Sequence, residues 1–592
     1  MNGPFAAYRR GAWREALAGA LRDLGVEADP AGRVALLNLA GACAMQLGDF
    51  DQAEACWQEV VRLQPGHADT WHNLAVLHRE RQHPAEAEAA CREALRARPD
   101  FDTAWRLLGD LLQGRQAVSE AETAYREALR CRPECPDTLH NLACLMVGAQ
   151  RFDEAERLLR ETLRLAPAHV LACNSLGNLL KARGRTAEAE AAYREALRLR
   201  PGLGLAWNNL GCLLREGGRR EEAGAALREA VRLEPTRVEA WYNLGELLHE
   251  QRRLAEAEAA YREALRLRPD YGAVSWDLAL LLLQTGRFAE GWERYEFRYR
   301  PENHRRFTPP LEPSFPPWQG EDLAGGALLV IGEQGLGDAI QFARFLPLLA
   351  ARGVGHLTLA CAPSLVTWMA GLSGLDRVVS GWRDGLHDPV PDRWVFLLSL
   401  PRHLGAVPTT MPARLSFSSV PSARDALWES RLPTGRLRVG LVWKGNPTHK
   451  NDAQRSLPGL RALAPLWSVP GVVFVSLQKG AGAEEAAAPP EDQPLTDLGR
   501  HIEDFADTAA IVARLDLVVA VDTAVVHLCG ALGRPCWVLL PFIGLDWRWP
   551  VDGTPSPWYP QGVRPFHQER PGEWTAPIGR ITWELVALLP QR

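Results

Sequence analysis

The sequence predicts an all-α solenoid followed by an α/β region of two doubly wound lobes, and three observations support this. The chain has 592 residues, several times the roughly 150 residues of an ordinary domain. Prolines recur every 34 residues through the first half, each at the end of a helical pattern. In the second half, short apolar runs alternate with helical segments, which is typical of parallel sheets covered by helices.

The composition is that of an ordinary globular protein. Hydrophobic residues make up 46% and charged residues 23% of the chain, values that exclude wholesale disorder. The formal net charge of −5 gives no electrostatic case for binding nucleic acid or an anionic membrane. Because nearly all basic residues are arginines, the few lysines (Lys181, Lys444, Lys450 and Lys479) are distinctive.

Cysteine usage and hydropathy favour a cytoplasmic protein. The eleven cysteines form no CxxC pair and no Cys/His cluster at zinc spacing, and an odd number fits buried thiols in a reducing compartment. The first residues lack the apolar core of a secretory signal. The longest aliphatic run, Leu278–Leu283, is too short to cross a bilayer. We therefore expect no membrane span, no bound metal and no cofactor.

A helical repeat runs from about residue 34 to residue 302, after degenerate capping helices over residues 1–33. Its prolines are Pro65, Pro99, Pro133, Pro167, Pro201, Pro235 and Pro269. The unit at 238–271 shows the full pattern in Trp241, Leu244, Gly245, Ala257, Ala264 and Pro269. This pattern resembles the tetratricopeptide repeat, in which small residues let two helices approach and proline ends the second. We expect about eight such units.

A polar stripe marks the surface that is expected to hold a partner. The residue two positions after the Trp position is polar in Asn73, Asn141, Ser175, Asn209, Asn243 and Asp277. An amide both donates and accepts, so a ladder of amides can bind the backbone of an extended polypeptide acceptor. The alternative is a solvated groove in which these residues only keep the surface polar.

The last repeat unit differs from the others in its aromatic residues. Trp292, Tyr295, Phe297 and Tyr299 stand where other units carry Ala and Arg, which suits a terminal helix packing against another part of the chain. Residues 303–320 form a Pro-rich connection. We expect an N-terminal lobe over 321–430 and a C-terminal, nucleotide-sugar-binding lobe over 431–592.

Two segments of the α/β region carry a family resemblance. GEQGLGDAIQFARFLPLL (332–349) is similar to the opening loop of heptosyltransferase-type glycosyltransferases. VDTAVVHLCGALGRPCWVLLP (521–541) resembles the Asp-Thr-x-x-x-His segment of the same enzymes. The resemblance implies a GT-B arrangement, with a donor cleft between the ends of the strands of two lobes. With the repeats included, the architecture is similar to that of O-linked N-acetylglucosamine transferase.

Several residues are expected to bind the donor. Gly335 and Gly337 lie in a strand-to-helix turn whose N–H groups suit a phosphate, although the turn is neither a Walker A loop nor a dinucleotide fingerprint. Lys444 ends a strand, where a compact ammonium suits a diphosphate, and the loop continues to Arg455 and Ser456. The alternative is an ordinary solvated loop.

Further donor contacts are expected in the last third of the chain. Gln478, with Lys479, ends the next strand at a position suited to the base or ribose. The resemblance implies that Asp522, Thr523 and His527 face the donor. Their ordinary roles would be helix capping and a core histidine.

Transfer to a hydroxyl requires a general base. The resemblance implies Asp338 for this role, with a helix cap as the alternative, and His449 is a second candidate. Trp547 or Trp549 could stack on a sugar, or could simply pack the two lobes together.

The sequence therefore predicts a metal-independent glycosyltransferase. It would move a sugar from a nucleotide-sugar co-substrate to a hydroxyl, most simply a Ser or Thr of a polypeptide held by the repeats. Alternative acceptors are flagellin, an adhesin or an envelope saccharide. The other class of function is a catalytically inactive scaffold that binds partners or a nucleotide.

Overall fold

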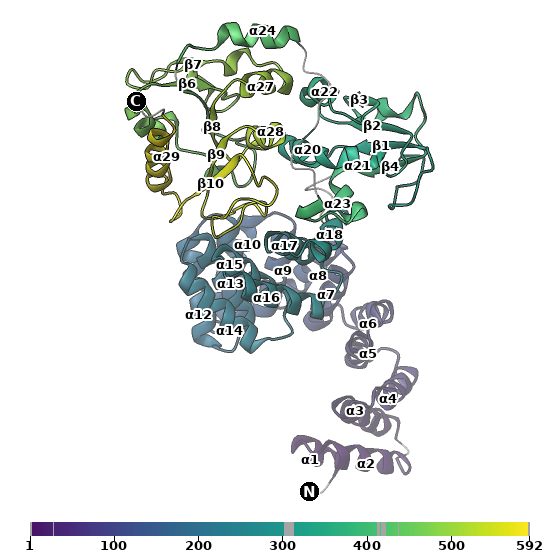
Figure 1. Cartoon of the computed structure of the whole chain (residues 1–592). Helices are drawn as coiled ribbons and strands as arrows, with labels where there is room; N and C mark the ends of the chain where they lie inside the picture. The colour runs from purple at the N-terminus through teal and green to yellow at the C-terminus, as the bar shows by residue number, and fades with distance from the viewer. Residues whose placement is uncertain are drawn as a thin grey trace. The chain divides into compact units, whose positions relative to one another are not determined.

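The computed structural model describes residues 3–27, 29–300, 313–410, 415, 422–435 and 437–589 (Figure 1). Internal contacts divide the chain into two compact units, Met1–Pro235 and Thr236–Arg592. Within the described residues no strand precedes Ala327, which confirms a helical first half. Much of the Pro-rich connection predicted at 303–320 lies outside the described residues, which resume at Pro313.

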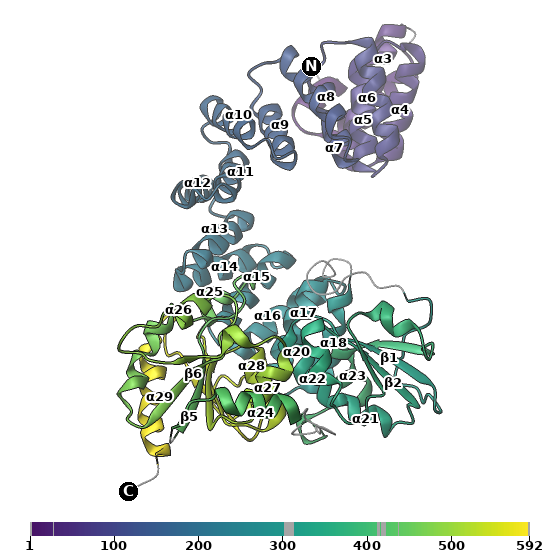
Figure 2. The ribbon, with the colours of Figure 1, turned by 90° about the horizontal axis from the view of Figure 1, so that it is seen from above.

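The first unit is a stack of helical hairpins, which Figure 2 shows in purple and blue. A short pair, α1 (Pro4–Arg9) and α2 (Trp13–Leu24), precedes them. The hairpin helices are α3 (Pro30–Leu47), α4 (Phe50–Leu63), α5 (Ala68–Glu80), α6 (Pro84–Ala97), α7 (Asp102–Gly114), α8 (Val118–Cys131), α9 (Pro136–Gly148), α10 (Phe152–Leu165), α11 (Val170–Ala182), α12 (Thr186–Leu199), α13 (Gly204–Glu216) and α14 (Arg220–Leu233). The first begins at Pro30 rather than near residue 34, because the Asp29 carboxylate caps it by accepting from the Gly32 N–H at 3.0 Å.

Small residues allow the helices of one hairpin to approach closely. The Tyr125 ring lies against Gly109, where an added Cβ would come within 2.5 Å of it. The same relationship joins Gly177 to Tyr193, again at 2.5 Å. Each tyrosine is almost fully buried, so the aromatic ring of one helix occupies the space left by the glycine of the other.

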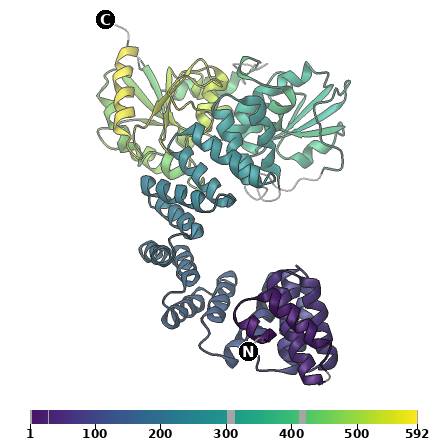
Figure 3. The same ribbon diagram turned by 90° about the horizontal axis from the view of Figure 1, so that it is seen from below.

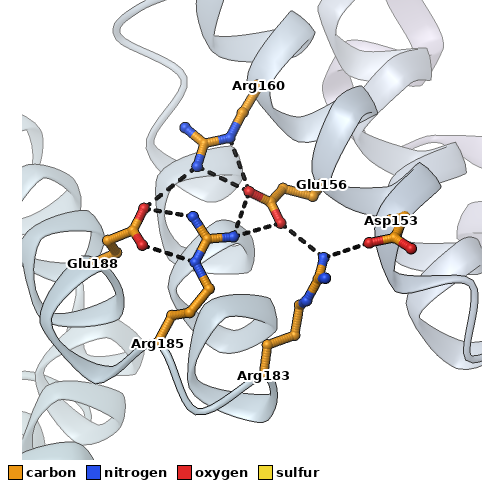
Figure 4. Close-up of polar contacts among 6 residues, drawn as sticks. All are labelled: Asp153, Glu156, Arg160, Arg183, Arg185 and Glu188. Carbon is orange, nitrogen blue, oxygen red and sulfur yellow. Dashed lines mark hydrogen bonds and ion pairs between the residues drawn. The ribbon is translucent and has the colours of Figure 1, made fainter.

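Ion pairs between arginine and glutamate link successive repeats (Figure 4). Glu156 of α10 accepts from Arg160 of the same helix at 2.9 Å and from Arg185 of the next repeat at 2.8 Å. The same spacing recurs one repeat earlier and one later, in Glu122–Arg151 and Glu190–Arg219. The arginines are partly exposed, so solvent screens these pairs and each one stabilises the stack only modestly.

The second unit begins with the last two hairpins, α15 (Val238–Glu250) with α16 (Leu254–Leu267) and α17 (Gly272–Gln284) with α18 (Phe288–Tyr295). A 3₁₀ turn, η1 (Glu296–Tyr299), follows. Together with the six hairpins of the first unit, the described helices form the eight expected units. The border between the compact units thus lies inside the repeats, whereas the predicted domain border lies at 303–320.

Two parallel sheets follow the repeats. The first has the order β3-β2-β1-β4, with β1 (Ala327–Ile331), β2 (His356–Ala360), β3 (Arg377–Val379) and β4 (Arg393–Phe396). The second has the order β10-β9-β8-β5-β6-β7, with β5 (Leu437–Val442), β6 (Val472–Ser476), β7 (Thr496–Asp497), β8 (Leu517–Val521), β9 (Cys536–Leu540) and β10 (Val563–His567). If the strands of each sheet are renumbered from one in chain order, the first sheet has the order 3-2-1-4. The second sheet, read from β7 to β10, has the order 3-2-1-4-5-6. Both are doubly wound patterns.

Helices connect and cover the strands, as Figure 3 shows. The described α-helices of this part are α20 (Leu336–Phe342), α21 (Leu346–Ala350), α22 (Pro363–Met369), α23 (Leu400–Leu404), α24 (Ser422–Arg431), α25 (Asp452–Arg455), α26 (Ala483–Ala487), α27 (Phe505–Val512), α28 (Ala524–Leu532) and α29 (Thr575–Leu588). The apolar run at 394–400 ends its strand at Phe396 and continues as a turn and α23. An apolar run alone does not distinguish a buried strand from a buried helix.

The last repeat shares its core with the α/β part. Trp292 of α18 packs edge-to-face on Phe342, Trp547 and Trp558, with ring centroids 5.7–6.0 Å apart. Its indole N–H donates to the Ala406 carbonyl at 3.1 Å. The aromatic residues that set the last repeat apart in the sequence therefore anchor it to the sheets.

Candidate functional site

A pocket of about 560 Å³ opens at the carboxyl ends of β5 and β8. These strands are adjacent, and the strand order reverses between them, which is where doubly wound sheets bind ligands. Of the eleven residues predicted for catalysis or donor binding, the pocket brings together Gly335, Gly337, Asp338, Lys444, His449, Arg455, Gln478, Asp522, Thr523 and His527.

Four cationic side chains line this pocket, and three of them, besides Arg548, lie in the loops after β5 and β6. Lys444 follows β5, and its ammonium lies 3.7 Å from a Glu485 carboxylate oxygen. Lys479 follows β6 and donates to the Ile502 carbonyl. Arg455 is held by Asp452 at 3.3 Å. The pocket therefore offers two ammonium groups and a guanidinium at the strand ends, a suitable set for a dianionic or trianionic phosphate group.

Gln478 has a different role from the one expected. Its side chain is buried, and its amide oxygen accepts from the backbone N–H groups of Trp443 at 2.9 Å and Lys444 at 3.0 Å. Its amide nitrogen donates to the carbonyls of Lys444 at 3.0 Å and Ala481 at 2.7 Å. The amide is saturated by backbone groups, so it holds two pocket loops together instead of offering a contact to a base or ribose.

Ser456 is the predicted donor residue that does not line the pocket. Its hydroxyl accepts from the Gly445 N–H at 2.8 Å and donates to Asp452 at 2.9 Å. These bonds shape the loop between Lys444 and Arg455, so Ser456 acts on the pocket through its neighbours.

Helix α28 begins in the pocket wall. Thr523 is its N-cap residue but makes no side-chain cap, and its hydroxyl oxygen is buried without a partner among the described residues. The first N–H groups of a helix also lack intrahelical partners. An unpaired hydroxyl beside unpaired N–H groups suits an anionic ligand.

Both carboxylate oxygens of Asp338 accept hydrogen bonds. Its Oδ2 accepts from the Gly335 N–H at 3.0 Å, which is the predicted cap of α20, and its Oδ1 accepts from Arg548. Arg548 is 5% exposed and also binds both oxygens of Asp546 at 3.0 Å. Burial disfavours its charge, but Asp546 and Asp338 outweigh burial and raise the pKa of Arg548. Sequence reasoning missed Arg548, because no motif or strand end marks it.

Asp522 stands at the end of β8, between Arg455 and the loop of Arg548. Burial and the Asp546 carboxylate raise the pKa of Asp522 to about 7, against the opposing influence of Arg455 and Arg548. No arginine, lysine or backbone N–H of the described residues bonds to its carboxylate. The Trp549 indole N–H acts on it weakly and without a regular hydrogen bond.

The two histidines of the site are favoured in their neutral forms. His527 is buried, with its Nδ1 2.7 Å from the Tyr559 hydroxyl, and burial followed by the positive charge of Arg548 lowers its pKa. The pKa of His449 is lowered by burial and by Arg455. His449 Nδ1 accepts from the Asn451 N–H at 3.2 Å, so the neutral ring carries its proton on Nε2 and can donate to a ligand there.

A second pocket, of about 470 Å³, adjoins the first. Both are lined by the group of side chains Asp338, His449, Arg455, Asp522, Asp546 and Arg548, which we call the junction. The second pocket extends to the last repeats, where His249, Trp276 and Gln284 line it. The junction therefore separates a pocket of the second sheet from a pocket that reaches the repeats.

Two tryptophans of the 542–560 loop, Trp547 and Trp549, are structural. Trp547 is 7% exposed and packs on Trp292 and Trp558, and Trp549 is fully buried near His527. Of the two roles considered from sequence, packing of the lobes fits their burial, since neither ring is exposed for stacking on a sugar.

The predicted groove residues are all partly exposed: Asn73, Asn141, Asn209, Asn243 and Asp277. Several of them already bind neighbouring repeats. Asn141 donates to Asp110 at 2.8 Å, and Asn209 donates to Asn174 at 3.0 Å. Asp277 accepts from the Tyr242 hydroxyl at 2.8 Å. Three of the five predicted residues therefore form hydrogen bonds to an adjacent repeat.

Two further properties concern the whole described part of the chain. It contains no group of three or more His, Cys, Asp or Glu side chains arranged to hold a metal ion. None of its helices is long and apolar enough to span a membrane.

Comparisons with known proteins identify the repeats. The tetratricopeptide repeat family model matches residues 38–100, 72–136, 140–203, 208–272 and 250–291. Protein FlbA of Caulobacter vibrioides is 32% identical over 323 residues, covering 50% of this chain and 52% of FlbA. The chain thus spans about half the length of this curated relative.

Two solved structures match parts of this chain at low sequence identity. A tetratricopeptide repeat protein from Parabacteroides merdae is 18% identical with a TM-score of 0.37, covering 42% of this chain and 99% of that one. The APC/C hetero-tetramer Cut9–Hcn1 gives 18% identity and a TM-score of 0.38, covering 47% of this chain and 54% of that one. The N-terminal half of this chain is built of tetratricopeptide repeats.

Proposed function

We propose that this chain is a glycosyltransferase that moves a sugar from a nucleotide-sugar donor to a hydroxyl of a polypeptide. The observation that carries the proposal is the pocket at the ends of β5 and β8, where Lys444, Lys479 and Arg455 meet the unpaired start of α28. A leaving nucleoside diphosphate must be neutralised, and fixed cations and helix dipoles do this without a metal ion.

The two sheets support a GT-B arrangement within this proposal. Both have doubly wound strand orders, and the glycine-rich turn after β1 lines the same pocket as the loops after β5 and β6. Helix α20, which follows that turn, packs against α28. Groups from both sheets thus surround the space assigned to the donor.

The adjoining pocket supports an acceptor that arrives from the side of the repeats. Its lining runs from His249, Trp276 and Gln284 of α15 and α17 to the junction. A hydroxyl in this second pocket would meet a donor sugar at the junction, where Asp338, His449 and Asp522 are the candidates for a general base. Repeat solenoids present extended binding surfaces, which favours a polypeptide over a small acceptor.

A donor screen tests the proposal. Full-length chain is mixed with UDP-, GDP-, ADP- and CMP-sugars, with and without EDTA, and the melting temperature and calorimetric affinity are measured. We expect one nucleotide class to bind and to raise the melting temperature, with no loss in EDTA. A matched Lys444→Ala/Lys479→Ala variant should lose that response. If no nucleotide sugar binds at saturating concentration, the inactive scaffold is the better account.

The acceptor is then identified by transfer from the donor that binds. Polypeptides rich in Ser and Thr, flagellin among them, are compared with envelope saccharides. Transfer to polypeptide alone is the expected result. Transfer to saccharide alone would keep the enzyme class and replace the acceptor.

A further inference from the structure

The junction contains three carboxylates and one imidazole that could accept a proton from an incoming hydroxyl. A general base needs an unoccupied lone pair within reach of the reacting oxygen. The hydrogen bonds of Asp338, Asp546, Asp522 and His449 therefore decide which of them is available.

In two of the carboxylates, both oxygens already accept hydrogen bonds. Asp338 holds the Gly335 N–H with one oxygen and Arg548 with the other. Asp546 accepts from the Arg548 guanidinium with both oxygens and from the Arg548 backbone N–H at 3.0 Å. Proton transfer to either would neutralise a carboxylate that pairs with the buried Arg548, which removes the counter-charge of that arginine and is costly.

Asp522 differs from both. It lies at the end of β8, it lines both pockets, and no described arginine, lysine or backbone N–H binds its carboxylate. On these grounds, and resting on the proposed function, we propose that Asp522 is the general base of the transfer and that Asp338 is a positioning residue. Asp338 would keep Arg548 and the glycine-rich turn in place.

In the step assigned to Asp522, every bond formed is matched by a bond broken. The acceptor O–H gives its proton to the Asp522 carboxylate as the acceptor oxygen bonds to the anomeric carbon of the sugar. The bond from that carbon to the diphosphate oxygen breaks, and its electron pair leaves with the nucleoside diphosphate. Lys444, Lys479 and Arg455 face the resulting charge. No oxidant, metal or further reactant is required.

Electrostatics are consistent with this role. The charged groups that act on Asp522 are Asp546, Arg455 and Arg548, while Lys444, His449, Asp338 and His527 complete the walls around it. Burial and Asp546 raise its pKa to about 7, so the carboxylate is an effective base near neutral pH. His449 remains a rival by position, but its Nδ1 already accepts from the Asn451 N–H, so its neutral ring carries the proton on Nε2, which donates and does not accept.

The experiment compares four variants, each containing one substitution: Asp522→Asn, Asp338→Asn, His449→Gln and Asp516→Asn. Asp516 stands at the other end of β8, where its carboxylate accepts from the Arg438 N–H at 2.7 Å, so it is a matched control outside the pocket. The probe is the nucleotide sugar that binds best in the donor screen. Release of nucleoside diphosphate with water as acceptor is followed from pH 5 to 9, with donor affinity measured by calorimetry.

We expect Asp522→Asn to lower kcat about 10²–10⁴-fold while donor affinity stays within about threefold. The parent kcat should rise with pH and level off above about pH 7, and the residual rate of Asp522→Asn should lack that rise. Asp338→Asn should act mainly on donor KM and melting temperature, and Asp516→Asn should match the parent.

Two results would overturn the assignment. One is an active parent with an equally active Asp522→Asn variant. The other is loss of kcat and of the pH rise in Asp338→Asn or His449→Gln instead. A parent kcat that does not rise between pH 5 and 7 would also contradict the assignment, and this measurement needs no variant. A parent that binds no nucleotide sugar overturns the proposed function itself, a result that calorimetry distinguishes from the others.

Discussion

Arg298, at the end of the last repeat, donates to Glu333 of the glycine-rich turn at 3.0 Å, and both side chains are buried. Arg298 lies between the rings of Tyr295 and Tyr299, with its guanidinium carbon 4.5 Å and 4.0 Å from their centroids. Burial raises the pKa of Glu333, although Arg298 opposes this. The repeat therefore fixes the start of the turn that lines the candidate donor pocket.

This pair should contribute strongly to stability. Arg298→Met removes the buried guanidinium that pairs with Glu333, which costs about 3–5 kcal/mol, whereas the double variant Arg298→Met/Glu333→Leu should recover much of the loss. The measurement is the midpoint of denaturant unfolding. The control is Arg402→Met, which removes an exposed pair with Glu293 (3.0 Å) and should cost no more than about 1 kcal/mol. Equal losses in the two single variants would contradict the prediction.

The two pocket lysines should share the donor diphosphate. Lys444→Ala or Lys479→Ala should each weaken nucleotide-sugar binding about 10- to 150-fold, the effect of losing a charged hydrogen bond of about 1.5–3 kcal/mol. Calorimetry measures this, and activity should survive EDTA. Lys181→Ala is the matched control, because Lys181 pairs with Glu216 at 2.7 Å in the repeats, outside the pocket lining. Donor affinity unchanged in both pocket variants would rule out the phosphate role.

Replacing Asn141, Asn209 and Asn243 together by Ala should separate acceptor capture from chemistry. Turnover with a long polypeptide acceptor should fall, since each amide contact is worth about 0.5–1.5 kcal/mol. Donor hydrolysis and short acceptors should be spared. Because Asn141 and Asn209 bind neighbouring repeats, a small drop in melting temperature is also expected. Unchanged kinetics with a long acceptor would leave the amides a purely structural role, and a loss of donor hydrolysis would indicate a damaged fold.

The ion pairs of Figure 4 should make the repeats sensitive to acid. Burial opposes the charge of Glu156, but Arg185 and Arg160 prevail and lower its pKa. A lowered carboxyl pKa stabilises the fold above the unfolded value of about 4.3, and this contribution is lost as pH falls below it. The melting temperature of Glu156→Gln should therefore lie below that of the parent at pH 7 in low salt. The difference between the two melting temperatures should disappear towards pH 3 or in 1 M salt. A gap independent of pH would contradict the ion-pair origin.

Local patterns in the sequence were sufficient for much of the fold. The 34-residue period predicts the hairpins, because each unit repeats the same contacts between near neighbours, such as Gly245 with Tyr261. The ends of β5 and β8 locate Lys444 and Asp522, because the carboxyl ends of parallel strands meet at one edge. The short strands β7 and β10 were not predicted, since Thr496–Asp497 has two residues and Pro565 interrupts the pattern of the other.

The sequence by itself determined the class of each half and most of the residues that line the pocket, since both follow from periodicity and strand ends. Only the tertiary structure decided how these residues are used. The side-chain amide of Gln478 forms its hydrogen bonds with backbone groups. The Asp338 carboxylate binds Arg548, which is 210 residues away in the sequence. The physical reason is that a hydrogen bond or ion pair depends on the position of both partners, and residues far apart in the chain are brought together only by folding.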